Sequence, residues 1–294
     1  MKAIEFPNVI AGCMNWGQWG ASFSTTDHRR MIESCLEAGV NVFDHADIYG
    51  HYTTEADFGK ALRESPSLRE RIRLITKCGI RLVTPNRPEH RIKSYDTSRG
   101  HIVASVERSL QNLHTDRIDL LLIHRPDPLM DPQEVAEAFR HLSASGKVLH
   151  FGVSNFNPRQ VDLMQRHHPV EVNQVEVSVL HPDCMYDGVL DQALREGIGI
   201  QAWSPMGAGR LNGENDDERS RRVMAMAAIL AEKHGCKPDQ VVLAWLFRHP
   251  AGIVPVVGTT RIERIRDAVE AKNVKLTAEE WFMLLRASTG HEVA

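Results

Sequence analysis

Short runs of β-branched and aliphatic residues alternate with longer amphipathic stretches along nearly the whole chain. Apolar runs of about four to eight residues are typical of buried strands, and a period near 3.6 residues is typical of helices. The pattern predicts eight strands, at residues 8–14, 40–45, 72–78, 118–124, 148–154, 170–177, 198–203 and 253–257. It predicts helices between them near 26–38, 54–64, 99–113, 131–145, 157–167, 185–196, 217–234 and 261–271, and two further helices at 238–248 and 277–288.

This alternation continues without a linker or a break in composition, which indicates one α/β domain spanning residues 1–294. Eight strands alternating with helices favour a single (β/α)8 TIM barrel with two additional helices. The alternative is a doubly wound sheet, which would carry a glycine-rich phosphate turn after its first strand. Gly17 and Gly20 in AGCMNWGQWGAS do not follow the GxGxxG pattern, and no helix is predicted directly after them. The barrel is therefore the favoured fold.

Composition narrows the function classes. The chain of 294 residues carries 35 basic and 38 acidic residues, a net charge of -3, and no basic block with interleaved aromatic residues, so nucleic acid is not an expected partner. Its five cysteines include no CxxC pair, which argues against a disulfide framework and a zinc ribbon. No signal-peptide segment and no apolar run of about 20 residues is present, so we expect a cytoplasmic protein without a membrane partner. Nothing in the sequence calls for more than a monomer or for a metal.

Four polar residues lie at or just after the downstream ends of predicted strands: Asp44 and Tyr49 in DHADIYG, Lys77 in RLITKCG, and His124 in DLLLIHRP. Side chains alternate across a strand, and those at the C-terminal ends of barrel strands face the mouth where active sites lie. Asp44 shares parity with Val42, and Lys77 shares parity with Ile75. Because unpaired buried charges are costly, we expect the four side chains to converge as mutual partners.

Such a group suits carbonyl chemistry. A free tyrosine titrates near 10. A lysine ammonium at ~4 Å, with an effective dielectric of ~20, would favour the phenolate by roughly 4 kcal/mol. This attraction could lower the pKa of the phenol by up to ~3 units, and desolvation would oppose the lowering. Lys77 would thus make Tyr49 a better acid, and Asp44 would keep Lys77 protonated. His124 would hydrogen-bond a substrate carbonyl. Side chains cannot supply the hydride that the carbonyl carbon then needs, which implies a nicotinamide cofactor.

At these residues the chain resembles the aldo-keto reductases, which reduce aldehydes and ketones with NADPH inside a (β/α)8 barrel. The resemblance covers essentially the whole chain and rests on ordered motifs: FDHADIYG (43–50), ITKCG (75–79), LLLIHRPD (120–127), GKVLHFGVSNF (146–156), VNQVEVS (172–178), QAWSPMGAGRL (201–211) and VVGTTRIERIR (256–266). It is strongest for bacterial members that carry HADIYG and IHRPDPLMD. The resemblance implies that Tyr49 is the acid, Lys77 and Asp44 its modulators, and His124 the carbonyl-orienting group.

The resemblance also implies a cofactor site. Ser154, Asn155 and Gln174 are similar to the residues that hold the nicotinamide carboxamide, and Trp203 to an aromatic ring that stacks on the nicotinamide. The family has a loop that covers the pyrophosphate. The residues of this chain that are similar to it are Ser204, Pro205, Met206, Gly207, Ala208, Gly209 and Arg210. Small residues there let backbone N–H groups approach an anion closely.

A 2′-phosphate site is implied at the start of a helix, by Gly258, Thr259, Thr260, Arg261 and Arg264. Hydroxyls, guanidinium groups and a helix N-terminus all suit a dianion, so NADPH is expected in preference to NADH. The family commonly continues with a Glu-Asn pair that contacts adenine, whereas this chain has Asp267 and Ala268. Asp267 can still make its contact, but the contact of the second residue is lost.

Two other functions are compatible with these motifs. Some relatives keep the whole site but serve as redox-sensing subunits, so a cofactor-binding regulatory protein with little turnover is one alternative. A class I aldolase using Lys77 as a Schiff base is another, although it leaves Tyr49 without a role. His45, of opposite parity to Asp44, is expected to pack outward against a helix. The polar connection 79–98 is expected to be the variable loop over substrate. Its Arg81, Arg87, Arg91 and Lys93 are expected to form a solvated surface, with selection of anionic carbonyl compounds as the alternative.

Overall fold

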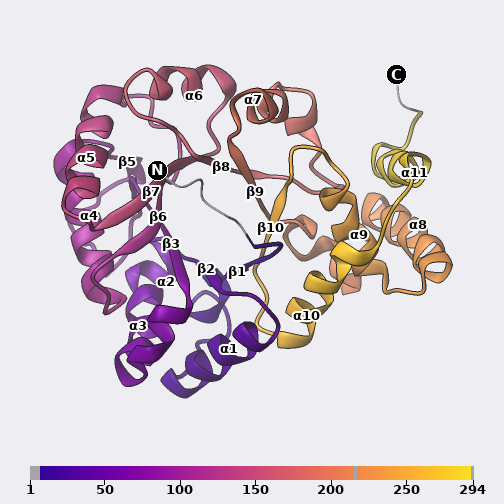
Figure 1. Cartoon of the computed structure of the whole chain (residues 1–294), viewed down its shortest axis with the longest axis horizontal. Coiled ribbons are helices and arrows are strands. Elements are labelled where there is room, and N and C mark those ends of the chain that lie inside the picture. The colour runs from indigo at the N-terminus through magenta and orange to yellow at the C-terminus, as the bar shows by residue number, and fades with distance from the viewer. Residues whose placement is uncertain (1–6, 215–216, 293–294) are drawn as a thin grey trace.

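The computed structural model describes residues 7–214 and 217–292. In this part of the chain, eight parallel strands close into a barrel in the order β1, β10, β9, β8, β7, β6, β3, β2 (Figure 1). Their bounds are β1 Ile10–Gly12, β2 Val42–Asp44, β3 Arg73–Cys78, β6 Ile118–Ile123, β7 Val148–Ser154, β8 Val172–Glu176, β9 Gly199–Trp203 and β10 Val254–Val257. Each strand lies within a predicted range, so the predicted (β/α)8 barrel is confirmed.

Helices surround the barrel on its outside (Figure 1). They are α1 Thr25–Glu37, α2 Tyr49–Tyr52, α3 Thr54–Glu64, α4 Arg99–Asn112, α5 Pro132–Ala144, α6 Pro158–Gln165, α7 Val189–Glu196, α8 Glu218–His234, α9 Pro238–Phe247, α10 Ile262–Glu270 and α11 Ala278–Thr289. Short helical turns are η1 Met14–Trp16, η2 Pro66–Arg71, η3 Asp183–Met185, η4 Gly207–Gly209, the π-helical η5 Arg210–Glu214 and η6 Ala271–Asn273. None of the helices in residues 7–214 and 217–292 is long and apolar enough to cross a membrane.

Local sequence fixes where several helices begin. Ser24 caps α1 and Asn157 caps α6, each in a capping box closed by the side chain three residues later, Asp27 or Gln160. Pro158 follows at the first helical position of α6, where its missing N–H costs no hydrogen bond. These caps fix where α1 and α6 begin after β1 and β7.

The barrel interior is apolar along most of its length. It is filled by the buried side chains of Ile10, Val42, Ile75, Leu120, Leu122, Val172, Val254 and Val256. The register places Asp44 beside Ile75 and Lys77 beside Leu122, and then Ser154 beside Gln174 and Gln174 beside Gln201. Polar groups therefore continue the inward rows at the C-terminal end of the barrel, as the parity of Asp44 and Lys77 predicts.

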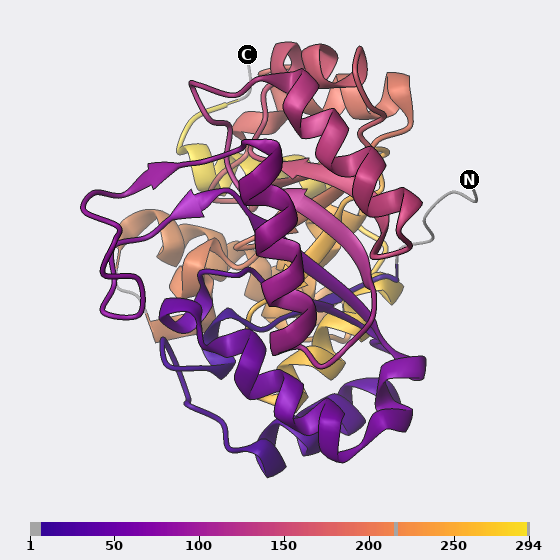
Figure 2. The ribbon, with the colours of Figure 1, turned by 90° about the vertical axis from the view of Figure 1, so that its left-hand side faces the viewer.

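The connection after β3 is more ordered than the sequence indicates. The segment 79–98, which the sequence predicts as a loop, contains β4 Ile80–Arg81 paired antiparallel with β5 Ser94–Tyr95. This hairpin projects beside the barrel (Figure 2). Strands of two residues are too short to show an alternating pattern, and their pairing depends on contacts with the rest of the fold.

Candidate active site

Lys77 is the centre of the polar group at the barrel mouth. Its Nζ, in a side chain 1% exposed, donates hydrogen bonds to Asp44 Oδ1 at 2.8 Å, to Asp44 Oδ2 at 2.7 Å and to the His45 carbonyl oxygen at 2.8 Å. It also lies 3.2 Å from the Tyr49 hydroxyl oxygen, to which it donates. The structure therefore brings Asp44, Lys77 and Tyr49 together, although they come from β2, β3 and α2.

The chain after β2 is shaped to deliver Tyr49. The Tyr49 N–H donates to the Ala46 carbonyl at 3.1 Å, which folds the segment back toward the strand end. Gly50 follows with a φ of 57°, and a Cβ on this residue would lie 2.4 Å from Thr54 Oγ1. Both conditions call for glycine, so the motif DIYG encodes the turn that aims the phenol at Lys77.

Electrostatics keep Lys77 charged. Burial lowers the pKa of its amine, but Asp44 and Tyr49 raise it further than burial lowers it, so the net pKa lies above 10.5. The ammonium thus persists at neutral pH. A lysine that forms a Schiff base must be neutral, so this raised pKa argues against the aldolase alternative.

Tyr49 titrates differently from the sequence expectation. Burial raises the pKa of the phenol above 10 by more than the attraction of Lys77 lowers it, and Asp44 adds to the rise. The lowering by Lys77 that the sequence predicts is present, but it does not set the net direction of the pKa of the phenol. The reason is burial of the ring, which sequence parity does not quantify.

His124 lies across the mouth from Tyr49. The two ring centroids are 6.1 Å apart in an edge-on arrangement. Burial, with the nearby Lys77, Arg125 and Lys93, lowers the pKa of His124 well below 6.5, so the imidazole is neutral. Its Nδ1 is buried without a hydrogen-bond partner among the described residues. The four predicted residues are thus neighbours in space.

The predicted carboxamide residues form a connected chain across the neighbouring strands. Trp203 Nε1 donates to Asn155 Oδ1 at 2.9 Å, and Asn155 Nδ2 donates to Ser154 Oγ at 2.7 Å. Ser154 Oγ in turn donates to the carbonyl of Gln174 at 2.8 Å. Asn155 adopts a φ of 61°, which turns the chain sharply after β7. The four side chains are therefore neighbours at one side of the mouth.

Gln201 is a member of the site that the sequence reasoning missed. Gln174 Nε2 donates to Asp44 Oδ1 at 2.9 Å and to Gln201 Oε1 at 2.9 Å, which joins the carboxamide residues to the Lys77 group. Gln201 is fully buried and shares the parity of Trp203 on β9. That parity was a signal in the sequence, since a buried amide on an inward row requires a polar partner.

The small-residue segment 204–210 winds tightly above β9. Ser204, Gly207, Ala208 and Gly209 all have positive φ, at 51°, 59°, 55° and 90°. A Cβ on Gly207 would lie 2.7 Å from Leu180 Cδ1, so this position also excludes a larger residue. Arg210 donates to Asp217, from Nε at 3.2 Å and from Nη2 at 2.8 Å, and Asp217 caps α8. The segment has the positive-φ backbone turns of an anion cradle, with one guanidinium anchored beside it.

Residues 258–261 lead into the N-terminus of α10. Arg261 occupies the N-cap position, but no side chain caps the free N–H groups of this helix. The segment is fixed from behind, because Trp16 Nε1 donates to the Thr259 carbonyl at 2.9 Å and Asn15 Nδ2 to the Gly258 carbonyl at 3.1 Å. An uncapped helix start with hydroxyls and arginines beside it can receive a phosphate.

Asp267 and Ala268, further along α10, differ in burial. Asp267 is half-buried, and both of its carboxylate oxygens accept from Nζ of Lys237, the N-cap residue of α9, at 2.7 and 2.8 Å. Ala268 is fully buried against the core. The position that commonly carries an adenine-contacting Asn in the family thus points inward here.

Two further sequence expectations concern His45 and the basic residues of the 79–98 connection. His45 is fully buried, with its ring centroid 4.5 Å from that of Phe58 on α3, so its outward packing is confirmed. Trp16 is also fully buried in this aromatic cluster. Arg91 and Lys93 are exposed, whereas Arg81 and Arg87 are half-buried and line a pocket. No group of three or more His, Cys, Asp or Glu that could hold a metal ion occurs in the described residues.

Comparisons with known proteins place these observations in context. The family model described as "Aldo/keto reductase family" matches residues 8–287. The uncharacterized oxidoreductase YcsN of Bacillus subtilis is 46% identical over 99% of this chain and 97% of its own length. A protein of Agrobacterium fabrum named 6-dehydroglucose reductase is 41% identical over 99% of this chain and 97% of its own. The aldo/keto reductase from Klebsiella pneumoniae, solved in complex with NADP and acetate, has a TM-score of 0.77 at 24% identity, covering 95% of this chain and 90% of that one.

Proposed function

This chain belongs to the aldo/keto reductase family, and we propose that it reduces an aldehyde or ketone to an alcohol with NADPH, using Tyr49 as the general acid. The observation that carries the proposal is the position of Lys77, whose ammonium contacts the Asp44 carboxylate at 2.7 Å and the Tyr49 hydroxyl at 3.2 Å. The Lys77 ammonium thus contacts both its buried counter-ion, Asp44, and the proton donor, Tyr49.

Tyr49 supplies the proton. Its raised pKa keeps the phenol protonated at neutral pH, so the donor is in the correct state before substrate binds. As the carbonyl oxygen gains negative charge, the phenol proton moves to it and the resulting phenolate is stabilised by Lys77 at hydrogen-bond distance. Asp44 holds the ammonium in place through both carboxylate oxygens.

His124 directs the substrate. The imidazole is neutral, so Nε2 can carry a hydrogen and donate it to the carbonyl oxygen beside Tyr49. A neutral donor binds the ground-state carbonyl without adding a second cation next to Lys77. His124 and Tyr49 together define one point where the reacting oxygen lies.

The residues present fit NADPH. When bound, the cofactor supplies the hydride. Ser154, Asn155, Gln174 and Trp203 would hold the nicotinamide end, residues 204–210 the pyrophosphate, and residues 258–261 with Arg264 and Asp267 the adenosine end. The fit is supported by the positive-φ backbone of Ser204, Gly207 and Gly209 and by the uncapped start of α10. The NADP named in the Klebsiella pneumoniae structure supports the same cofactor, and Arg261 and Arg264 favour the 2′-phosphorylated form.

The relatives suggest a class of substrate. A 41% identical protein is named 6-dehydroglucose reductase, and we propose a small hydroxylated aldehyde as the first substrate to test. We further propose that the chain acts as one domain and as a cytoplasmic monomer, on small molecules rather than on nucleic acid. The net charge of -3 supports the last point.

An isotope experiment tests this function. The protein is incubated with NADPH carrying deuterium at C4 of the nicotinamide and with aldehydes and ketones that include 6-dehydroglucose. Deuterium on the former carbonyl carbon of an alcohol product is the expected result. Tight binding of NADPH without oxidation across the whole panel would contradict the proposal and favour the regulatory alternative.

A further inference from the structure

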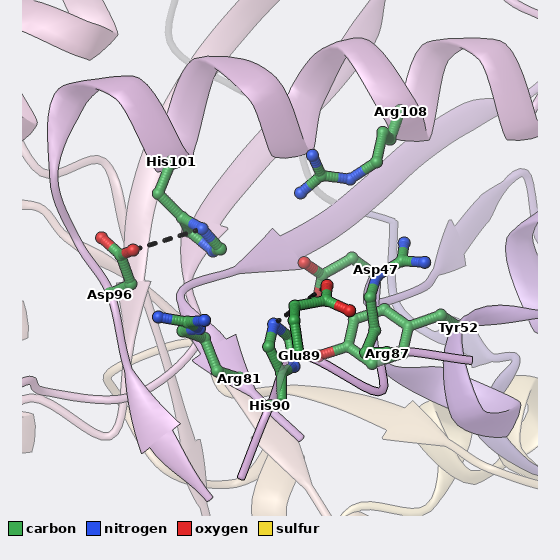
Figure 3. A pocket seen from close by; sticks show the side chains of 9 residues that line it. All are labelled: Asp47, Tyr52, Arg81, Arg87, Glu89, His90, Asp96, His101 and Arg108. Atoms are coloured by element: carbon green, nitrogen blue, oxygen red, sulfur yellow. Dashed lines mark ion pairs between the residues drawn. The ribbon is translucent and has the colours of Figure 1, made fainter. Parts of the chain in front are cut away.

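A separate pocket of about 380 Å³ lies under the β4–β5 hairpin (Figure 3). Its lining comes from the loop after β2, from α2, from the hairpin and from α4, and comprises Asp47, Tyr52, Arg81, Arg87, Glu89, His90, Asp96, His101 and Arg108. Neither Lys77 nor His124 belongs to it. The volume lies near the lower end of the range of roughly 300–1,000 Å³ that small-molecule sites occupy.

Three arginines from separate segments line this pocket. Arg81 comes from β4, Arg87 from the connection between the hairpin strands, and Arg108 from α4 (Figure 3). Arg81 forms no side-chain hydrogen bond or ion pair with any residue in the described part of the chain. Arg87 donates only to the Asn86 carbonyl, at 3.0 Å, and Arg108 only to Ser105 Oγ, at 2.9 Å. Since each guanidinium has five N–H donors, most of this capacity is uncommitted.

In the described part of the chain, no carboxylate of the pocket forms a hydrogen bond or an ion pair with Arg81, Arg87 or Arg108. Asp96 lies 3.5 Å from His101, and Glu89, whose side chain is 60% exposed, lies 3.7 Å from His90. Asp47 Oδ1 is buried and has no hydrogen-bond partner among the described residues. Burial, reinforced by Glu55, raises the pKa of Asp47 well above its ordinary value despite Arg108 and Arg87. The pocket therefore gathers three arginines beside one buried carboxyl whose charged form is disfavoured by burial.

The wall around the arginines is held in place. The Tyr52 hydroxyl donates to the Ile80 carbonyl at 3.3 Å and accepts from the Leu82 N–H at 2.9 Å, which ties α2 to the hairpin. The Arg87 guanidinium stacks 4.6 Å above the centre of the Tyr52 ring. An anchored guanidinium loses less side-chain entropy when it binds an anion, which favours recognition over loose surface attraction.

We propose that this pocket binds a small phosphate-bearing anion through Arg81, Arg87 and Arg108. Three guanidinium groups approaching from different sides match the peripheral oxygens of a phosphate better than the two oxygens of one carboxylate. The volume admits a phosphate together with a short organic group. Bound phosphate would join the hairpin to α4 and to the loop of Asp47, whose N–H donates to the Lys77 carbonyl at 3.0 Å. The site goes beyond the proposed reductase activity and does not require it.

Isothermal titration with inorganic phosphate and with glycerol 3-phosphate tests the proposal. The protein is first saturated with NADP⁺, so that phosphate sites of a cofactor are filled. One saturable site is expected, with the ester bound at least as tightly as the free ion. Arg81→Gln and Arg108→Gln should each weaken binding by about tenfold or more, the loss of one charge-assisted contact. Arg63→Gln, which removes an exposed arginine on α3 outside the pocket, is the matched control and should change nothing.

Several results would overturn the proposal. They are absence of saturable binding, equal weakening in the Arg63→Gln control, or tighter binding of succinate than of either phosphate. Circular dichroism of each variant excludes loss of folding as a cause. If the protein does not take up NADP⁺, the titration is repeated without it in an Arg264→Ala background. Phosphate binding that persists there and still depends on Arg108 supports the pocket independently of the reductase proposal.

Discussion

Replacing Asp44 by Asn tests the electrostatic core of the site. Asp44 Oδ2 lies 2.7 Å from Lys77 Nζ, and both side chains are almost fully buried. At an effective dielectric of ~20, this attraction is worth about 6 kcal/mol, equivalent to about 4 pKa units. Without the carboxylate, burial opposes the ammonium and only Tyr49 still favours it, so the pKa of Lys77 should fall toward the neutral range.

The assay is the pH profile of kcat/KM for NADPH-dependent carbonyl reduction. The wild-type profile should be flat between about pH 7 and 9, because neither Lys77, with its raised pKa, nor His124, with its lowered pKa, titrates there. In Asp44→Asn the rate should be lower throughout and should fall further as the pH rises through the new pKa of Lys77. The free energy of unfolding should also decrease by about 3 kcal/mol, since a buried charge pair is broken.

Asp57→Asn is the matched control. Asp57 contacts Lys60 at the similar distance of 2.8 Å, but both side chains are substantially exposed, so the loss should be below about 1 kcal/mol and the pH profile unchanged. A flat profile in Asp44→Asn like that of the wild type, or equal destabilisation in the two variants, would refute the reasoning.

Three further predictions concern stability and the cofactor. His28 is fully buried among aromatic rings, and burial lowers its pKa to about 4, so the stability it confers is complete above pH 6.5 and is lost as the pH falls from 6.5 toward 4. Urea unfolding of His28→Phe should show about 3 kcal/mol less loss between pH 7 and pH 4, and an undiminished loss would contradict this. Arg264→Ala should weaken NADPH binding by about 10- to 100-fold and leave NADH binding unchanged, as measured by fluorescence titration, whereas equal losses would remove Arg264 from the phosphate site. Gly59→Ala should lower the free energy of unfolding by about 1–3 kcal/mol, because a Cβ there would lie 1.9 Å from the Asn112 carbonyl oxygen, and unchanged stability would show that α3 and α4 can separate.

Much of the fold follows from the sequence for identifiable reasons. Strands such as β6, with the sequence IDLLLI, are dominated by apolar residues because both faces of a barrel strand are buried, and such runs have clear ends. Asp44 and Lys77 could be paired in advance because parity places both on inward rows at the same end of neighbouring strands. The hairpin of β4 and β5 could not, since two-residue strands have no period.

The pKa of Tyr49 and the lining of the second pocket were harder to predict from the sequence, because both depend on burial. The sequence shows that Tyr49 and Lys77 can meet, but the net rise in the pKa of Tyr49 is set by how deeply the ring is enclosed. The pocket beneath the hairpin is a similar case. Arg81 and Arg87 are predictable as charged residues on a connection, but Arg108 joins them only because α4 packs behind that connection. Convergence of distant segments on one cavity has no local signature in the chain.

The most direct test of the central claim is single-turnover hydride transfer in Tyr49→Phe, followed as NADPH oxidation after mixing with a carbonyl substrate. The phenyl ring preserves the packing beside His124 but has no proton to give, so the rate should fall by about 10²- to 10⁴-fold while the affinity for NADPH is unchanged. A rate equal to that of the wild type would contradict the assignment of Tyr49 as the acid.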